Sequence, residues 1–210
     1  MIVEVFASGP ADTNAYLVAC PKTRQAVVID VPPDSLGSLL ERTHELQLTV
    51  AMILLTHSHW DHFGDAFELK EKLKVPLYIH KEDAGNLEVP GSDRLPLFFP
   101  IKGVEPNGFL EDGQILNVGE LKIQVIHTPG HTPGGVCFYL EEQKALFSGD
   151  TLFQGTIGNL SFPTARPERM WDSLKRLAAL PKETRVYPGH GDPTTIGKEQ
   201  WIVDAEKRFN

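Results

Sequence analysis

The segment THSHWDH at residues 56–62 places three histidines and one aspartate within six positions, directly after a continuous apolar run. Such a run predicts a strand that is buried on both faces. Neutral imidazole and carboxylate are ligands that zinc and iron accept. Alternate residues of an extended segment point to the same side, so His57 and His59 can converge on one ion. Asp61 and His62 follow where the chain turns into a helix, and they could hold a second ion beside the first.

Three further candidates stand where short apolar strands end in glycine-containing turns, namely His131, Asp150 and His190. Active sites are commonly built from such strand-end loops on a rigid sheet. Each residue alone would be an ordinary turn residue, but with the first cluster they make a set large enough for two ions that share one carboxylate. The candidate metal ligands are His57, His59, Asp61, His62, His131, Asp150 and His190.

The other three histidines are given structural roles. His44 lies in a predicted helix and is expected at the surface. His80 ends a predicted strand. His127 is close enough to His131 to support it, but a place at the end of a strand is favoured.

The composition is that of an ordinary globular protein. Of the 210 residues, 41% are hydrophobic and 23% are charged, so residues 1–210 are interpreted as a single ordered domain. The formal net charge of −8 argues against a broad nucleic-acid-binding face. The N-terminus lacks the basic stretch of a signal peptide, and no apolar run has the length of a membrane span.

The chain contains two cysteines, Cys20 and Cys137, which both lie in apolar runs and form no Cys-x-x-Cys pair. We expect two buried, reduced thiols, which suits a reducing compartment. Together with the lack of targeting signals, this predicts a cytoplasmic protein.

Strand-like and helix-like stretches follow one another in a pattern that is repeated twice: a block of strands, then strands mixed with helices. This order predicts an α/β or α+β fold in which two sheets pack together with helices outside. Strands are predicted at 2–6, 14–20, 26–30, 52–55, 77–79, 114–118, 121–126, 136–140, 145–148 and 185–187. Helices are predicted at 36–46, 64–73, 168–179 and 195–207.

Residues 84–111 are predicted as a long loop, because they are rich in proline and glycine. The loop includes an apolar cluster from Leu95 to Ile101 that could lie over a substrate cleft, with Phe153 and Phe162 beside it. The alternatives are that these side chains pack in the core or within the loop, or form a subunit contact.

The motifs resemble those of the metallo-β-lactamase superfamily. Thr-His-x-His-x-Asp-His at 56–62, followed by a distant His, Asp and His, carries the resemblance over nearly the whole chain. The longer motifs at 128–134 (TPGHTPG), 148–153 (SGDTLF) and 187–191 (YPGHG) more closely resemble those of glyoxalase II-like hydrolases. The resemblance implies a four-layer αββα sandwich, with two metal ions between the edges of two sheets.

The resemblance also assigns the ligands to the two metals. His57, His59 and His131 would hold one ion, whereas Asp61, His62 and His190 would hold the other, and Asp150 would bridge them. Asp30 ends a strand where the family often keeps an aspartate that hydrogen-bonds a ligand histidine, although a simple turn aspartate is the alternative.

The sequence departs from the family pattern in three places. The chain ends about 20 residues after His190, without the C-terminal basic region that grips glutathione in long-form relatives, which weakens a glutathione-thioester assignment. After Gly158 the sequence has Asn159 and Ser161, where close relatives often have Arg-x-Asp, and this change affects a loop near the substrate. The third departure is Asp-Val-Pro at 30–32 in place of Asp-x-Gly.

The resulting hypothesis is a metal-dependent hydrolase. A hydroxide bridging two divalent ions would attack a carbonyl carbon, with Asp150 sharing its charge between the ions and Asp61 orienting the hydroxide, as the two catalytic residues. Zinc is the expected metal, with iron and manganese as alternatives. The expected partner is a small-molecule thioester, S-lactoylglutathione or a related acyl-thioester.

Three alternatives remain open at this point. The first is a persulfide dioxygenase with a single iron on the His57, His59 and His131 type of site. The second is a lactonase on the same scaffold. The third is a metal-stabilised binding module without activity, which the complete ligand set argues against because structural zinc sites are normally closed and four-coordinate.

Overall fold

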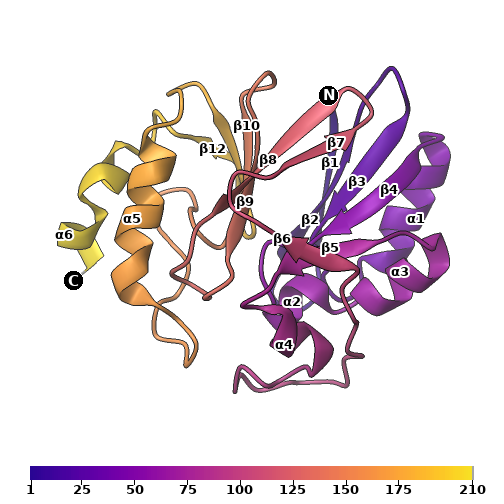
Figure 1. Ribbon diagram of the computed structural model, residues 1–210, viewed down its shortest axis with the longest axis horizontal. Coiled ribbons are helices and arrows are strands. Elements are labelled where there is room, and N and C mark those ends of the chain that lie inside the picture. Colours follow the sequence, from indigo (N-terminus) through magenta and orange to yellow (C-terminus); the bar gives the residue numbers. More distant parts are fainter. Residues whose placement is uncertain (210) are drawn as a thin grey trace.

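Two six-stranded sheets face each other, and helices cover the outer side of each sheet (Figure 1). The computed structural model describes residues 1–209. The first sheet contains β1 (Ile2–Ser8), β2 (Thr13–Ala19), β3 (Gln25–Ile29), β4 (Thr49–Leu54), β5 (Leu77–His80) and β6 (Gly108–Leu110). The second contains β7 (Ile115–Val118), β8 (Leu121–His127), β9 (Val136–Leu140), β10 (Ala145–Gly149), β11 (Arg185–Pro188) and β12 (Thr194–Thr195). These layers confirm the expected four-layer αββα sandwich.

The helices divide between the two outer layers. Those beside the first sheet are α1 (Leu36–Glu45), α2 (Trp60–Phe63), α3 (Ala66–Leu73) and α4 (Ala84–Glu88). Those beside the second sheet are α5 (Pro167–Ala178), the 3-10 helix η1 (Gln200–Asp204) and α6 (Ala205–Phe209).

Each sheet combines antiparallel and parallel pairs. In the first, β1, β2 and β3 are antiparallel, and β3 through β6 are parallel. In the second, β7 through β10 are antiparallel, β10 and β11 are parallel, and β12 closes the edge antiparallel to β11. Because β10 and β11 run in parallel, the segments that follow them leave the sheet at the same edge.

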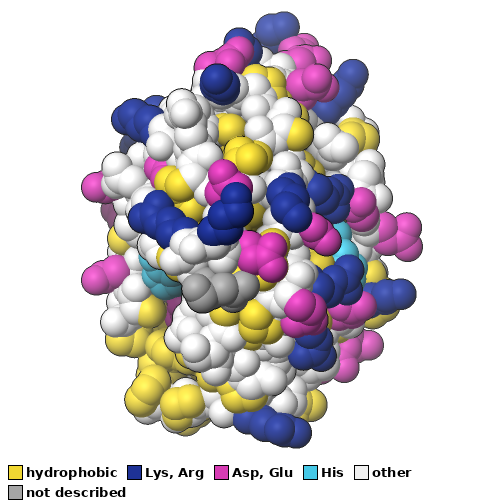
Figure 2. All heavy atoms as spheres, turned by 90° about the vertical axis from the view of Figure 1, so that its left-hand side faces the viewer, with side chains coloured by type: hydrophobic (Ala, Val, Ile, Leu, Met, Phe, Trp, Pro, Cys, Tyr) yellow, Lys and Arg dark blue, Asp and Glu magenta, His cyan; other side chains and the backbone are white. Residues whose placement is uncertain are grey.

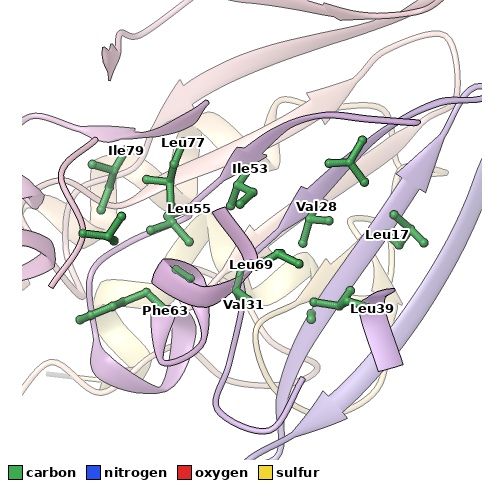
Figure 3. Packing of buried hydrophobic residues seen from close by; sticks show 14 of the residues in the cluster. Leu17, Val28, Val31, Leu39, Ile53, Leu55, Phe63, Leu69, Leu77 and Ile79 are labelled. Carbon is green, nitrogen blue, oxygen red and sulfur yellow. The ribbon is translucent and has the colours of Figure 1, made fainter. Parts of the chain in front are cut away.

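Alternating side chains build three apolar interfaces between the four layers. In β2, Leu17 and Ala19 pack against the helices, whereas Tyr16 and Val18 pack against the facing sheet. Figure 3 shows the first of these cores, where Leu39 of α1 joins the sheet residues. The third core lies between the second sheet and α5, η1 and α6. The continuous apolar runs in the sequence are therefore strands with both faces buried.

Two predicted segments differ from the structure because contacts distant in sequence decide them. The predicted loop 84–111 contains α4 and the edge strand β6, which pairs with Tyr78–His80 and is too short to show a period of two. The predicted helix 195–207 begins as β12 and continues as η1 and α6. Glu199 is buried there, and its carboxylate accepts hydrogen bonds from Thr194 and Trp201, which bends the chain between β12 and η1.

The predicted helix 64–73 is confirmed only from its third residue, and a short separate helix, α2, precedes it. The backbone N–H of Asp65 donates to the carbonyl of Val31, and the Asp65 carboxylate accepts from the backbone N–H of Leu36. The Asp65 N–H thus bonds to the segment after β3, whereas in a continuous helix it would bond to the carbonyl four residues earlier. The helical pattern is therefore interrupted between α2 and α3.

The smaller predictions agree with the structure. His44 is exposed, His80 is buried at the end of β5, and His127 ends β8. Cys20 and Cys137 are buried and unpaired. Basic and acidic side chains are interspersed over the face that carries α5 and α6 (Figure 2), with ion pairs such as Lys175–Asp172. Within residues 1–209, no helix is both long and apolar enough to cross a membrane.

Acid is expected to weaken the fold through His80, whose ring stacks on His127 with centroids 4.1 Å apart. Burial, together with the charge of His127, lowers the pKa of His80 to about 4. The unfolded chain therefore binds a proton first, and stability is lost as the pH falls from about 6.5 toward 4. We expect His80→Phe to remove about 1–2 kcal/mol of the stability difference between pH 7 and pH 5, measured by urea unfolding. An equal difference in both proteins would contradict this.

Candidate metal centre

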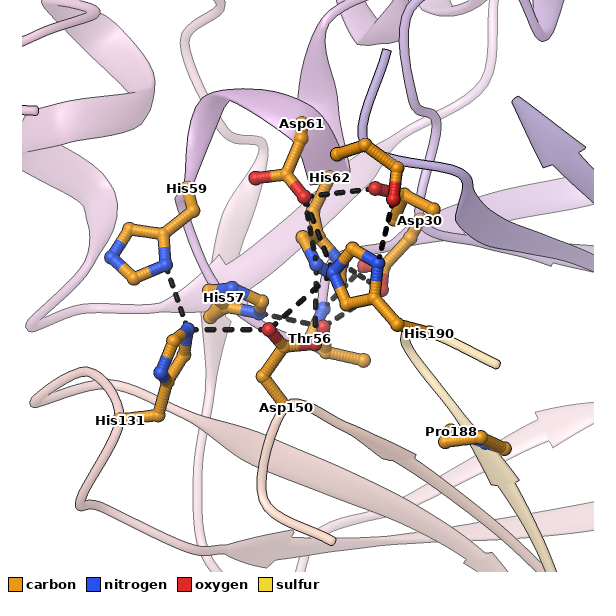
Figure 4. Close-up of polar contacts among 12 residues, drawn as sticks. Asp30, Thr56, His57, His59, Asp61, His62, His131, Asp150, Pro188 and His190 are labelled. Atoms are coloured by element: carbon orange, nitrogen blue, oxygen red, sulfur yellow. Dashed lines mark hydrogen bonds and ion pairs between the residues drawn. The ribbon is translucent and has the colours of Figure 1, made fainter. Parts of the chain in front are cut away.

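Seven histidine and aspartate side chains meet at one edge of the sandwich, between the two sheets (Figure 4). Four of them come from the first half of the chain, on the segment after β4 and on α2. The other three follow β8, β10 and β11 of the second sheet. In chain order they are His57, His59, Asp61, His62, His131, Asp150 and His190.

Asp150 stands at the middle of this cluster. Its Oδ2 lies 3.3 Å from Nε2 of His131 and 3.5 Å from Nε2 of His190. Its Oδ1 lies 3.3 Å from Nε2 of His62. On one side of the cluster, Nδ1 of His59 is 2.8 Å from Nε2 of His131. The carboxylate therefore touches residues of both halves of the site.

The ligand atoms gather in overlapping groups, each small enough to surround one ion. Within each group, the atoms lie within 4.8 Å of one another. The groups are His57, His59 and His131; His57, His62 and Asp150; and Asp61, His62 and His190. The structure thus brings all seven sequence candidates together, with Asp150 between the first and the last group.

Glycines let the strands approach this closely. At Gly149, φ is +48°, and a Cβ would stand 2.6 Å from Oγ1 of Thr56. At Gly189, a Cβ would stand 2.2 Å from Oδ1 of Asp150. A side chain at either position would push β10 or β11 away from the cluster, which explains the glycines that precede Asp150 and His190 in the sequence.

Two histidine rings are oriented by backbone carbonyls. Nδ1 of His131 lies 2.8 Å from the carbonyl oxygen of Asn159, and Nδ1 of His190 lies 3.1 Å from that of Ala11. A carbonyl only accepts hydrogen bonds, so in both rings Nδ1 carries a proton. In the neutral ring, Nε2 then presents its lone pair to the cluster.

Asp30 orients two more rings, as the family resemblance predicted for one of them. Its Oδ2 lies 2.9 Å from Nδ1 of His62 and accepts the Thr56 hydroxyl at 2.8 Å. Because the Thr56 hydroxyl donates its one hydrogen bond to Asp30, it can only accept from Nδ1 of His57, 3.0 Å away. Four of the five rings are therefore held with Nε2 facing the cluster.

The buried ligand atoms suit metal ions. Most buried polar atoms in proteins have hydrogen-bond partners, because leaving them unpaired costs about 1–3 kcal/mol each. Within the described residues, Nε2 of His57, His59 and His62 and Oδ1 of Asp150 have no hydrogen-bond partner. The atoms of His57, His62 and Asp150 face the cluster, and His59 turns its Nδ1 toward it instead (Figure 4). Imidazole nitrogen with carboxylate oxygen is a donor set that divalent zinc, iron or manganese accepts.

The pKa shifts of the histidines divide the cluster into two parts, one in which they are lowered and one in which they are raised. Burial and neighbouring histidines lower the pKa of His57 and His59, the latter to about 3, so these rings stay neutral. Burial acts against the charge of His62 and His190 as well, but nearby carboxylates outweigh it and raise the pKa of His190 to about 9. Asp150 stays ionised, because the charge of His62 outweighs its burial and holds its pKa well below the usual range.

Sequence reasoning missed Asp83, which ties two ligand segments together. This fully buried carboxylate follows β5 and accepts the backbone N–H of Ser58 at 3.1 Å and that of Gly134 at 2.6 Å. Ser58 stands between His57 and His59, and Gly134 belongs to the turn that carries His131. No local pattern distinguishes Asp83 from a surface aspartate, since both partners are distant in sequence.

A cleft of about 420 Å³ opens from the cluster to solvent. Of the seven ligand residues, His190 and Asp61 are the most exposed, with 27% and 14% of their side-chain surface accessible. Phe153 and Phe162 line it, as the sequence interpretation anticipated for substrate contacts. The other lining residues include Trp60, Leu95, Pro96, Phe98 and Asn159.

Comparison with known proteins agrees with this arrangement. A family model described as the metallo-beta-lactamase superfamily matches residues 8–190. The hydroxyacylglutathione hydrolase GloC of Haemophilus influenzae is 34% identical over 186 residues, which are 84% of this chain and 85% of that protein. The crystal structure of BLEG-1 B3 metallo-beta-lactamase has a TM-score of 0.87 at 35% identity. That of TTHA1623 in a di-iron-bound form has a TM-score of 0.82 at 41% identity, and both cover 94% of this chain and 96% of their own.

Proposed function

Because the chain belongs to the metallo-beta-lactamase superfamily, we propose that it is a metal-dependent hydrolase that cleaves acyl thioesters, the class that includes S-lactoylglutathione. The observation that carries the proposal is the cluster of seven ligand residues, in which Nε2 of His57, Nε2 of His62 and Oδ1 of Asp150 are buried, face the cluster and have no hydrogen-bond partner. The relative from Haemophilus influenzae, a hydroxyacylglutathione hydrolase, supports the choice of thioesters.

In this proposal the seven residues hold two divalent ions. His57, His59 and His131 hold one, Asp61, His62 and His190 hold the other, and Asp150 contributes to both. When bound, the two ions supply a water molecule of lowered pKa and neutralise negative charge that develops on a carbonyl oxygen. Zinc is the proposed metal, and iron or manganese would suit the same donors.

The chain's own residues position the reactants. The Oδ2 atom of Asp61 accepts the Thr13 hydroxyl at 2.8 Å, which fixes the carboxylate at the floor of the cleft, where it orients the attacking water. Phe153 and Phe162 flank His190 and His131, with ring centroids 5.8 Å and 5.6 Å apart respectively, and exclude bulk water. Among the described residues that line the cleft there is no serine or cysteine, so no side-chain hydroxyl or thiol competes there with water as the nucleophile.

The test is metal content combined with thioester hydrolysis. We expect two metal ions per chain, and loss of thioester absorbance with the lactoyl thioesters of glutathione and of N-acetylcysteamine. Dialysis against a chelator should abolish the loss, and added metal should restore it. A fully metallated protein that hydrolyses neither ester would contradict the proposal.

The same measurements separate the alternatives. One iron per chain, no thioester hydrolysis and oxygen uptake with glutathione persulfide would indicate a persulfide dioxygenase. Hydrolysis of lactones without that of thioesters would indicate a lactonase.

A further inference from the structure

The walls of the cleft are aromatic. Phe162 lies edge-on to His59 and His131, with ring centroids 5.2 Å and 5.6 Å away. Phe153 lies edge-on to His190 on the other side, at 5.8 Å. At the mouth, Phe98 lies edge-on to Trp60, the residue just before Asp61, at 5.7 Å. Aromatic rings therefore flank the metal ligands on two sides of the cleft, and a further pair stands at its mouth.

The same walls hold no positive side chain. Among the described residues that line the cleft there is no lysine or arginine, and the carboxylates of Asp61 and Asp150 lie at its floor. Proteins recognise carboxylates with arginine or lysine, and a carboxylate left unpaired against apolar walls loses its hydration without compensation. Glutathione carries two carboxylates, so its thioesters gain no ionic contact from the side chains that wall this cleft.

We propose that the cleft binds acyl thioesters whose thiol portion is uncharged and apolar, in preference to glutathione thioesters. This inference rests on the proposed thioesterase function and names the substrate class of that site. The apolar thiol portion packs between Phe98, Phe153 and Phe162, while the thioester carbonyl would lie at the metal ions that Asp61, Asp150 and the histidines hold.

Phe98 is the specificity-determining residue in this proposal. Its side chain is 73% exposed, which is unusual for phenylalanine, and it lies at the edge of the cleft rather than in a core. The exposed ring costs hydrophobic free energy unless a ligand covers it. A thiol portion that covers the ring provides this burial, and each buried methylene group improves binding about fourfold.

The experiment compares three lactoyl thioesters with the metal-loaded protein: those of phenylmethanethiol, N-acetylcysteamine and glutathione. Each kcat/KM is divided by the rate at which hydroxide alone hydrolyses the same ester, which removes differences in leaving-group reactivity. We expect the corrected value for the phenylmethanethiol ester to exceed that for the glutathione ester by about tenfold or more.

Variants of Phe98 give a second readout. Phe98→Ala should lower kcat/KM more for the phenylmethanethiol ester than for the N-acetylcysteamine ester, mainly through KM. Phe98→Lys should raise kcat/KM for the glutathione ester, because it places a cation at the edge of the cleft. The control is Phe109→Ala, which removes a 51% exposed ring on β6 that does not line the cleft, and it should leave all three values unchanged.

The outcomes distinguish the two proposals. A corrected value for the glutathione ester that equals or exceeds that for the phenylmethanethiol ester would overturn the inference and leave the thioesterase function standing. Equal losses in Phe98→Ala and Phe109→Ala would likewise remove Phe98 from substrate binding. Hydrolysis of none of the three esters by the metal-loaded protein would overturn the proposed function, and the inference with it.

Discussion

Replacing Asp150 with alanine is expected to remove at least one metal ion per chain and to lower thioester turnover by on the order of a thousandfold or more. Asp150 lies within 3.5 Å of ligand nitrogens on three histidines, so its loss affects both ion sites. It also removes one of the carboxylates that raise the pKa of His62 and of His190. Metal analysis of the purified variant, with kcat/KM measured in saturating metal, checks the prediction.

The control for this variant is Asp172→Ala, which removes a carboxylate that is 84% exposed on α5 and forms an ion pair with Lys175. It should keep two metals and full activity. Circular dichroism of both variants separates a lost site from a lost fold. A folded Asp150→Ala protein with two metals and wild-type turnover would refute the two-ion assignment.

The second large effect is expected from Asp30→Asn, because the Asp30 carboxylate supports the site without touching the metals. One carboxylate accepts the backbone N–H and the hydroxyl of Thr56 and Nδ1 of His62. Asparagine keeps one acceptor oxygen and turns an N–H group toward buried donors. We expect metal affinity to fall about 10- to 100-fold and the metal-free fold to lose about 2 kcal/mol.

Competition with a chelator measures the affinity, and urea unfolding of the metal-free protein measures the stability. Asp34→Asn is the matched control, since Asp34 is an exposed carboxylate four residues away and asparagine tolerates its φ of +65°. If both variants bound metal as tightly as the wild type, Asp30 would have no role in orienting His62.

The seven residues that the structure brings together could be picked from the sequence because the signal for each of them is local. The segment 56–62 carries four candidate ligands in one strand-to-helix turn, and the other three each follow an apolar run. The αββα architecture came from the family resemblance, whereas periodicity alone left α/β and α+β open. The ligand roles and the single-domain assignment of residues 1–210 remain predictions.

What the sequence did not predict depends on contacts between distant residues. Asp83 joins Ser58 and Gly134, which are 25 and 51 positions away, so no window of sequence contains both partners. The strand β6 has only three residues and exists through its pairing with β5. The helical pattern at 195–207 lost its first part to β12 and to the carboxylate of Glu199, because tertiary contacts override local propensity.

An early and a late segment of the chain meet at the cluster, and this limits when the site can be completed during synthesis. Thr13 forms a bridge with His190, and the backbone N–H of Asn14 donates to the carbonyl of Gly189. A ribosome makes the first four proposed ligands before the second sheet begins, but the last one only near residue 190. The complete set therefore cannot form before residue 190 has been made, and until then a nascent chain carries His57 to His62 as an incomplete group of ligands.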